Sequence, residues 1–292
     1  MFIAILSIIA PVVVCVLVGF LWTRTGRPFD TPFVTRLVMN VGAPFLILSS
    51  FQKTSPSAAE LAEVGLAAVC ITAVTAVVAI VVLRLLRANL KTFFPAIVFQ
   101  NTGNMGLPLC LFAFGDAGLS LAIVVFMWVA TINFTVGVAI ASGERNLLRT
   151  LRTPLVWATF LSIALALAGI SLPLWLRSTA DILGGLTIPM MLITLGVSLS
   201  NVKVTAVVRS AGFASLRFLL GCSIGWLISE AFGLTGVARG VIILQSSMPP
   251  AVFNYLIAAR YERDVSEIAG VVAVGTVMSI GVVPVVLWLL LS

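Results

Sequence analysis

The chain has 292 residues, of which 61% are hydrophobic and only 9% charged, and its formal net charge is +7. Soluble domains carry about 25% charged residues, so this composition excludes an ordinary soluble domain and predicts an integral membrane protein. The excess of basic residues is then expected in loops beside the membrane and not in a nucleic-acid site. Histidine is absent, which removes the usual proton shuttle, zinc ligand and base of nucleophilic triads.

The apolar runs predict an all-α polytopic membrane protein with ten spans, because a bilayer-spanning helix uses about 20 apolar residues. The short connections leave no room for a soluble domain. The first run is too long for a cleaved signal peptide and lacks a basic start, so it is counted as a span. The predicted spans are 2–22, 31–51, 61–83, 92–114, 118–141, 154–176, 180–200, 206–231, 237–259 and 266–291.

Lys and Arg are distributed unevenly between the connections. The even-numbered connections hold only Lys53, Arg177 and Arg239. Cytoplasmic loops are enriched in basic residues, so the odd-numbered connections are expected in the cytoplasm and both termini outside it. The expected localisation is the inner (plasma) membrane of a bacterium. The odd-numbered connections hold Arg24, Arg27, Arg84, Arg87, Lys91, Arg145, Arg149, Arg152, Lys203, Arg209, Arg260 and Arg263.

The two halves of the chain resemble each other at an offset of 145 residues. Pro44 of the second span corresponds to Pro189 of the seventh, and residues 97–100 (Ile-Val-Phe-Gln) correspond to residues 242–245 (Ile-Ile-Leu-Gln). This offset predicts two five-helix repeats, 1–141 and 154–292. Because five is odd, the second repeat starts on the opposite side of the membrane, so the repeats are predicted to be inverted.

The fourth and ninth spans each contain a polar interruption near the middle. The first covers residues 100–108 (Gln-Asn-Thr-Gly-Asn-Met-Gly-Leu-Pro), and the second covers residues 245–250 (Gln-Ser-Ser-Met-Pro-Pro). Proline and glycine interrupt helices, and such breaks occur in a bilayer only where protein or water satisfies the freed backbone groups. Broken helices at matching positions of two repeats indicate the central site of a transporter.

These interruptions favour an anionic substrate. A new half-helix is expected near Pro108 and near Pro249, each with its positive N-terminal end toward the bilayer midplane. Neutral donors nearby can bind a carboxylate, or they can merely cap the broken ends. The candidate substrate-binding residues are Asn101, Thr102, Asn104, Gln245, Ser246, Ser247 and Asn254, and the candidate hinge residues are Gly103, Gly106, Pro108, Pro249 and Pro250.

Charged residues are almost absent from the predicted span interiors. All ten acidic residues fall in connections or near span ends. Sodium- and proton-coupled carriers commonly use buried carboxylates, so coupling is disfavoured, although neutral groups and carbonyls can still bind sodium. Arg217 is the one charge expected well inside a span. It either pairs with a substrate carboxylate or extends its side chain to the cytoplasmic surface.

The sequence resembles the auxin efflux carrier family, which includes plant PIN-type auxin exporters and bacterial organic-acid permeases. The resemblance rests on Asn101-Thr102-x-x-Met105-Gly106-x-Pro108 and Gln245-x-x-Met248-Pro249, with Pro44 in support, and its span pattern covers the whole chain. It implies the fold of bile-acid symporters and sodium-proton antiporters, in which the two broken helices cross. Asn101 matches the family's substrate-contacting asparagine, and Pro108 and Pro249 match its crossover prolines.

The resemblance also implies how such a carrier works. Spans 1, 2, 6 and 7, which hold Pro44 and Pro189, would form a scaffold and the surface of a homodimer. Spans 3–5 and 8–10 would form a core that carries the substrate in an elevator-like movement. The short connection 142–153 and the pair Gly103-Asn104 differ from plant members, so malate or malonate fits at least as well as auxin.

The expected function is secondary transport of an auxin-like monocarboxylate or small dicarboxylate by alternating access, with the membrane potential favouring export. The expected partners are this anion and the lipid bilayer, and no cofactor, metal, nucleic acid or enzymatic activity is expected. The alternatives are a sodium- or proton-coupled symporter of the same acids, a passive channel, and an intramembrane protease. Phe114-Gly115-Asp116 faintly resembles an aspartyl-protease motif, but no second midplane aspartate accompanies it.

Overall fold

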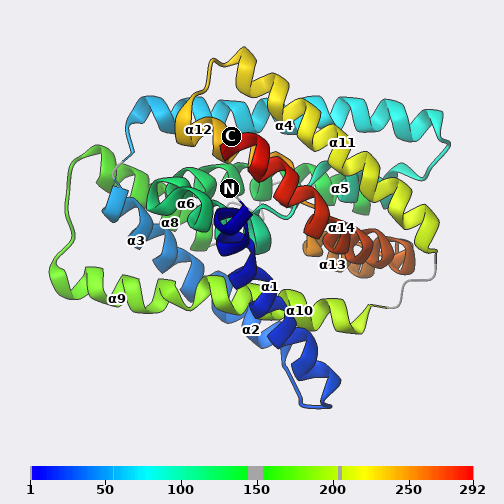
Figure 1. Cartoon of the computed structure of the whole chain (residues 1–292), viewed down its shortest axis with the longest axis horizontal. Coiled ribbons are helices and arrows are strands. Elements are labelled where there is room, and N and C mark those ends of the chain that lie inside the picture. Colours follow the sequence, from blue (N-terminus) through cyan, green and yellow to red (C-terminus); the bar gives the residue numbers. More distant parts are fainter. Residues whose placement is uncertain (1, 55, 144–153, 203–205, 292) are drawn as a thin grey trace.

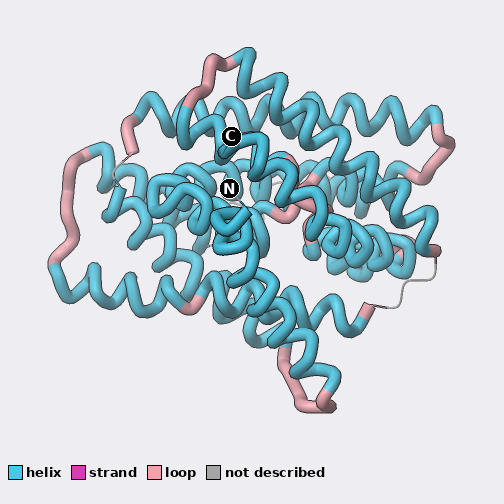
Figure 2. The backbone as a smooth tube through the Cα atoms, in the orientation of Figure 1, coloured by secondary structure: helices cyan, strands magenta, loops and turns pink. Residues whose placement is uncertain are grey.

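A computed structural model of the protein describes residues 2–54, 56–143, 154–202 and 206–291. Within these ranges the chain is helical and forms no strand, apart from an isolated bridge between Gln100 and Pro250 (Figure 2). The first half contains α1 (Phe2–Arg24), α2 (Thr31–Leu37), η1 (Val38–Gly42), α3 (Ala43–Thr54), α4 (Ala58–Leu85), α5 (Leu90–Val98), η2 (Thr102–Gly106), α6 (Leu107–Ile132), η3 (Asn133–Gly137) and α7 (Val138–Ser142). The second half contains α8 (Pro154–Leu167), α9 (Leu174–Gly185), α10 (Thr187–Asn201), α11 (Val207–Ala231), α12 (Gly236–Ser246), α13 (Val252–Arg260) and α14 (Val265–Leu291).

Several of these helices are long and apolar enough to cross a membrane, as expected of a polytopic helical membrane protein. Predicted span 9 is divided into the short helices α12 and α13, and predicted span 4 is divided between the short α5 and the long stretch that also contains span 5, so helix length does not decide the predicted number of ten spans. Four of the basic residues used to orient the chain, Arg145, Arg149, Arg152 and Lys203, lie outside the described residues. The seven stretches that qualify are Phe2–Arg24, Thr31–Thr54, Ala58–Leu85, Thr102–Ser142, Leu174–Asn201, Val207–Ala231 and Val265–Leu291.

The long helical stretch that begins at η2 bends at Gly115. Gly115 has a φ of 66°, a left-handed conformation that glycine adopts without the steric cost of a Cβ atom. Residues 115–117 are exposed. This bend separates the predicted fourth span from the fifth.

The predicted second and seventh spans are each divided just before their corresponding prolines. The junction of η1 and α3 precedes Pro44, and the junction of α9 and α10 precedes Pro189. The two junctions touch, because a Cβ atom on Gly42 would lie only 2.6 Å from Oγ1 of Thr187. Gly42 and Thr187 are 145 positions apart, so corresponding positions of the two halves meet here.

The helices pack in two groups. In the first, α1 lies along α10, and α3 packs against α8 and α9; Figure 1 shows α9 and α10 nearly end to end, with α1 crossing α10. In the second, α4 packs against α5, α6 and α11, and α11 packs against α12 and α14. The groups meet where α10 contacts η2 and where α3 contacts α6. The two breaks therefore lie beside the boundary between the groups.

Candidate functional site

Both predicted interruptions are present, but the half-helices after them begin at different residues from those expected. The chain is non-helical at residues 99–101 and becomes helical again at Thr102, earlier than the expected start near Pro108, although the α-helix α6 itself begins at Leu107. Pro108 lies instead in the first turn of α6, directly after the π turn η2, which accommodates its missing amide. After α12 the helix resumes at Val252. Pro249 and Pro250 precede this start because proline favours extended backbone and cannot continue a helix.

The two breaks cross and bind each other through their backbones. The N–H of Asn101 donates to the carbonyl of Pro249 (2.8 Å), and the N–H of Ala251 donates to the carbonyl of Phe99 (3.1 Å). Non-helical backbone at membrane depth must find its partners within the protein. These two hydrogen bonds meet part of that requirement and join the two halves of the chain.

Asn101 caps the helix that follows the first break. Its Oδ1 accepts a hydrogen bond from the N–H of Asn104 (3.2 Å), which satisfies one of the amides that a helix leaves unpaired at its start. The side chain is 4% exposed. Its Nδ2 is buried without a hydrogen-bond partner in the described part of the chain. An unpaired buried donor is costly, so Nδ2 is a group that a ligand can satisfy.

Gln245 fits into the space left by a missing side chain at Gly106. A Cβ atom on Gly106 would lie 2.1 Å from Oε1 of Gln245 and 2.7 Å from its Cδ. Gln245 is fully buried. Its Nε2 reaches the carbonyl of Ala122 at 3.5 Å, while Oε1 has no partner among the described residues. The position therefore requires glycine for a close approach of a polar side chain.

Gly106→Ala is expected to lower the free energy of unfolding by about 1–3 kcal/mol, the usual cost of overpacking a filled site. Gln245→Ala removes the atoms that the new methyl group would meet. The double variant Gly106→Ala/Gln245→Ala should therefore be more stable than the sum of the single changes predicts. Thermal unfolding of the four proteins in detergent measures this coupling, and strictly additive effects would contradict the proposed contact.

Asn254 joins the break to a residue that the sequence reasoning missed. Its Nδ2 donates to the carbonyl of Phe99 (3.0 Å), and its Oδ1 accepts from Nδ2 of Asn133 (3.3 Å). Both side chains are at least nine-tenths buried, and Oδ1 of Asn133 has no partner within the described ranges. Asn133 lies at the start of η3, inside a long apolar stretch. An amide side chain within this apolar stretch was the only feature of the sequence that could have indicated a role for Asn133 at the break.

The hydroxyl groups near the second break are used within their own helix. Oγ of Ser246 donates to the carbonyl of Ile243 (3.0 Å), and Oγ of Ser247 donates to the same carbonyl (2.7 Å). Both serines are buried, as is Thr102 after the first break. In this conformation the two serines hydrogen-bond a backbone carbonyl at the end of α12. This is the capping role that the sequence analysis gave as the alternative to substrate binding.

Arg217 binds the ends of two half-helices. Its side chain has no exposed surface, so it does not extend to the cytoplasmic surface. Nη1 donates to the carbonyls of Ile97 (2.9 Å) and Val98 (3.3 Å), Nη2 donates to the carbonyl of Ser246, and Nε donates to the carbonyl of Met248 (3.5 Å). All three guanidinium nitrogens are therefore directed at the backbone of the crossover.

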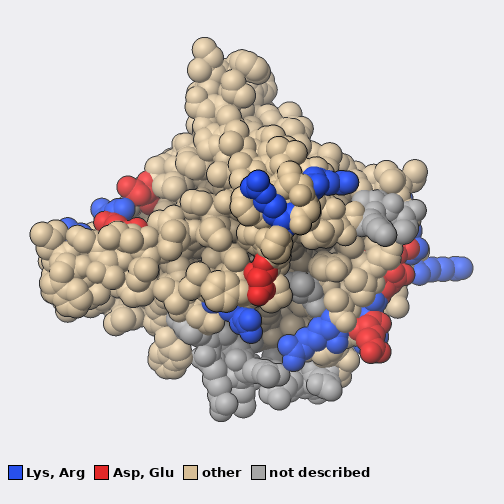
Figure 3. All heavy atoms as spheres, turned by 90° about the horizontal axis from the view of Figure 1, so that it is seen from below, with Lys and Arg blue, Asp and Glu red and all other residues tan. Residues whose placement is uncertain are grey.

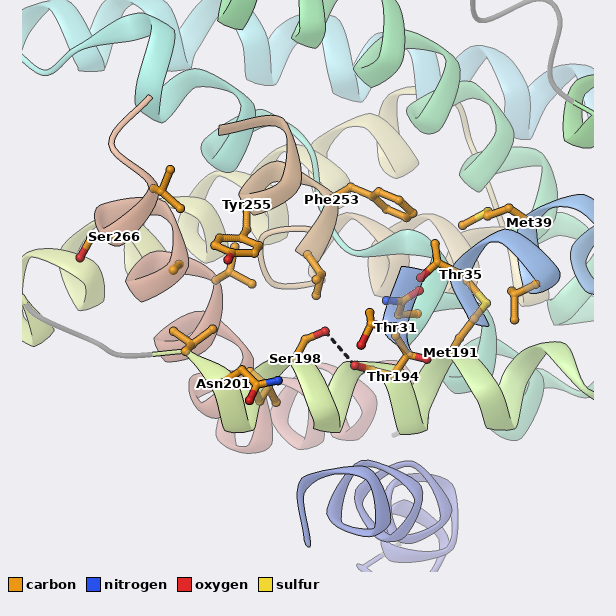
Figure 4. A pocket seen from close by; sticks show the side chains of 18 residues that line it. Thr31, Thr35, Met39, Met191, Thr194, Ser198, Asn201, Phe253, Tyr255 and Ser266 are labelled. Atoms are coloured by element: carbon orange, nitrogen blue, oxygen red, sulfur yellow. Dashed lines mark hydrogen bonds between the residues drawn. The ribbon is translucent and has the colours of Figure 1, made fainter. Parts of the chain in front are cut away.

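A cavity of about 660 Å³ lies between the two groups of helices, beside the breaks (Figure 4). Asn104 of η2 lines it, as do Val252 and Phe253 at the start of α13. Across the cavity, α10 contributes Met191, Thr194 and Ser198; the Ser198 hydroxyl donates to the carbonyl of Thr194 (2.8 Å). The polar groups of the lining belong to Thr31, Thr35, Asn104, Thr194, Ser198, Asn201, Tyr255 and Ser266.

The cavity offers amide and hydroxyl groups but no charge among the described lining residues. Thr194 Oγ1 is buried without a partner in the described part of the chain. Gly103 lies near this boundary, because a Cβ atom on it would be 2.9 Å from the ring of Phe126 and 3.2 Å from Cε of Met191. The remaining lining is largely apolar, so the cavity suits a molecule with a polar group and an apolar body.

Apart from Arg217, the charged side chains of the described residues are not buried. In the view of Figure 3 they form separate clusters with wide uncharged areas between them. Among the described residues no carboxylate is buried, and Arg217 is the one buried charge. One cluster joins Lys53 to Asp181 (3.0 Å), which also accepts a hydrogen bond from Ser49. The described residues contain no group of His, Cys, Asp and Glu that could hold a metal ion.

Comparison with known proteins identifies the family. The sequence profile described as "Membrane transport protein", which represents the auxin efflux carriers, matches residues 4–146 and 138–288. The chain belongs to the auxin efflux carrier family. An uncharacterized transporter of Methanocaldococcus jannaschii is 29% identical over an alignment of 203 positions that covers 66% of each chain. An uncharacterized transporter of Methanothermobacter thermautotrophicus is 26% identical over an alignment of 292 positions that covers 95% of each chain.

Membership in the auxin efflux carrier family assigns the protein to the multi-pass membrane transport proteins. The family and both relatives are transporters and not enzymes. Asp116, which suggested a protease motif, is exposed beside the bend at Gly115. The crossover and the cavity are therefore to be interpreted as parts of a transporter.

Proposed function

We propose that this auxin efflux carrier family member is a secondary carrier of organic anions and that the crossover beside the cavity is its substrate site. The unpaired Nδ2 of Asn101, buried at the start of a half-helix, is the observation that carries the proposal. A carboxylate is the group that would satisfy a buried amide donor next to positive helix ends.

The electrostatics of the site support an anion. The helix starting at Thr102 and the helix starting at Val252 both have their N-terminal ends beside the cavity, where Asn104, Val252 and Phe253 line it. Each such end carries about half a positive charge. No buried carboxylate opposes them among the described residues. Asn101 caps the first of these helices and Asn104 lines the cavity. Gln245 and Asn254 contact the first break.

The packing supports an elevator-like division of the molecule. In this proposal ten spans form two inverted repeats, with α1, α3, α8, α9 and α10 in the scaffold and α4–α7 and α11–α14 in the core. The scaffold helices contact one another, and the core helices contact one another. The cavity lies between these two groups, so a movement of the core past α10 would carry a bound anion across the membrane.

The cavity lies toward the side that we assign to the cytoplasm. Thr31, Val202 and Ser266, which line it, border the first, seventh and ninth connections, all of which are odd-numbered. Toward the other side, Oγ1 of Thr54 donates to Oγ of Ser120 (3.0 Å) and so joins α3 to α6. This arrangement corresponds to an inward-facing carrier in a plasma membrane, with both termini outside.

The membrane potential supplies the driving force in this proposal. A potential of about 100 mV provides about 2.3 kcal/mol for each charge that crosses, which favours export of an anion from a cell that is negative inside. The substrate is an auxin-like monocarboxylate or a small dicarboxylate. The apolar surface of Met39, Met191 and Phe253 in the cavity gives space for an aromatic or aliphatic body.

Electrical recording from proteoliposomes on a solid support tests the function. Indole-3-acetate, malate and malonate are applied in sodium-free buffer at equal pH on both sides. At least one of them is expected to produce a saturable movement of negative charge that protein-free liposomes lack. Currents that appear only with sodium or a pH gradient would indicate a coupled symporter, currents that never saturate would indicate a channel, and silence throughout would contradict anion transport.

A further inference from the structure

We propose that Arg217 is a fixed intramolecular cation that occupies the place of a coupling ion at the crossover. On this view the carrier moves its anion without sodium or protons because it already contains the positive charge that such ions bring to the site in other carriers. The inference rests on the proposed function of organic anion transport. It goes beyond that function by assigning to one residue the reason why no coupling ion is needed.

The carbonyl groups around Arg217 are of the kind that binds coupling ions. In carriers with broken helices, unwound backbone carbonyls and the C-terminal ends of half-helices coordinate sodium. Here the carbonyls of Ile97 and Val98 lie at the end of α5, and those of Ser246 and Met248 lie at the end of α12 and just beyond it. All four accept hydrogen bonds from Arg217. A sodium ion that used these carbonyls would have to displace the guanidinium group.

The charges of the crossover balance with this residue in place. Each helix end carries about half an elementary charge, negative at the C-terminus and positive at the N-terminus. The C-terminal ends of α5 and α12 together approach one negative charge, and the guanidinium group of Arg217 neutralises it. The N-terminal ends at Thr102 and Val252 together approach one positive charge beside the cavity. That charge remains available to a monovalent anion, without a second ion.

Arg217 cannot exchange as a mobile ion does. It is fully buried, and no carboxylate pairs with it in the described part of the chain. Gly221, one turn later in α11, leaves the room for this arrangement, since a Cβ atom there would lie 2.1 Å from the carbonyl oxygen of Ser246 and 2.6 Å from Nη2 of Arg217. Held by α11, the charge travels with the core. Arg217 is therefore a positioning residue and not a substrate ligand.

The first test uses the wild-type protein. Substrate-induced currents in proteoliposomes are compared in sodium chloride and in choline chloride, at equal pH on both sides. Equal currents in the two salts are expected, because no cation has to bind. A requirement for sodium, or a current that needs a proton gradient, would overturn the inference while leaving anion transport itself intact.

The second test compares Arg217→Lys with Arg217→Gln. Both replacement side chains are shorter than arginine, but only lysine keeps the positive charge. In choline chloride, Arg217→Lys is expected to transport at least about tenfold faster than Arg217→Gln, since hydrogen bonds from a charged donor are the stronger ones. Sodium should stimulate only Arg217→Gln. Equal sodium-independent transport by the two variants would show that the charge is not what matters.

A third measurement needs no transport and separates this inference from the proposed function. The melting temperatures of wild type, Arg217→Ala and the control Arg36→Ala, whose arginine is exposed on α2, are measured in choline chloride with sodium or guanidinium added. Either cation should raise the melting temperature of Arg217→Ala relative to the other two proteins. Its failure to do so would overturn the role of Arg217 even if anion currents are observed. Stabilisation of Arg217→Ala alone would support the role even if every anion tested proves inactive.

Discussion

Asn101→Ala is expected to abolish saturable transport while the protein still folds. The change removes Nδ2, the unpaired buried donor at the first break, and a hydrogen bond from such a group to a charged ligand contributes about 1.5–3 kcal/mol. The backbone bond from Asn101 to Pro249 does not depend on the side chain and should persist. Loss of the helix cap costs only about 1 kcal/mol. Substrate currents and the melting temperature are measured on the same preparation.

Asn101→Ser is the matched control for the cap. Serine at this position can accept a hydrogen bond from the N–H of Asn104 about as well as asparagine does, but it lacks the amide donor. Asn101→Ser is therefore expected to melt close to the wild type and to transport as poorly as Asn101→Ala. Normal transport by either variant, when it is well folded, would remove Asn101 from the substrate site.

Asn101→Asp tests whether the site binds an anion. An aspartate retains the cap and places a negative charge at the start of a helix, where the helix dipole stabilises it. The variant should fold at least as well as Asn101→Ser and should repel a carboxylate. Retained transport of organic anions by Asn101→Asp would argue for a substrate that is not negatively charged.

The sequence was sufficient to predict where the helices break and which residues surround the breaks. Proline and glycine in an apolar run act locally, so the interruptions at residues 100–108 and 245–250 could be recognised without a structure. The first half-helix was expected to start near Pro108, and the α-helix α6 does begin at Leu107, but the helical backbone already starts at Thr102. The π turn that absorbs Pro108 has no sequence signature of its own.

Contacts between distant segments were not predictable in the same way. Arg217 and Ile97 are 120 positions apart, and only the fold shows that this arginine binds backbone carbonyls of the crossover. Asn133 was overlooked because its partner Asn254 is 121 positions away. Gly106 was assigned to a hinge, and the close approach of the Gln245 side chain to it could not be foreseen from local sequence. Local pattern thus located the two breaks, but the partner of each polar group followed from the packing.

Gly196→Ala is expected to lower the stability more than Gly106→Ala or Asn101→Ala does, because the added methyl group would meet backbone atoms. A Cβ atom on Gly196 of α10 would lie 1.9 Å from the carbonyl oxygen of Val16 and 2.8 Å from the backbone nitrogen of Phe20, both in α1. Small residues allow such close helix contacts in membranes. Overpacking costs about 1–3 kcal/mol and occasionally more, and here no flexible side chain can give way. Thermal unfolding in detergent measures the loss.

Gly281→Ala is the control, since a Cβ atom on Gly281 of α14 would meet nothing within 4 Å and alanine favours a helix by up to about 1 kcal/mol relative to glycine. Equal melting temperatures of Gly196→Ala and Gly281→Ala would contradict the close contact of α1 with α10.

The opposite face of α10 lines the cavity with Met191, Thr194 and Ser198. If the clash displaces α1 into the lipid, transport at a permissive temperature should keep its KM; if it displaces α10 into the cavity, the KM should rise. The KM of Gly196→Ala therefore reports which of the two helices is held more firmly by the rest of the scaffold.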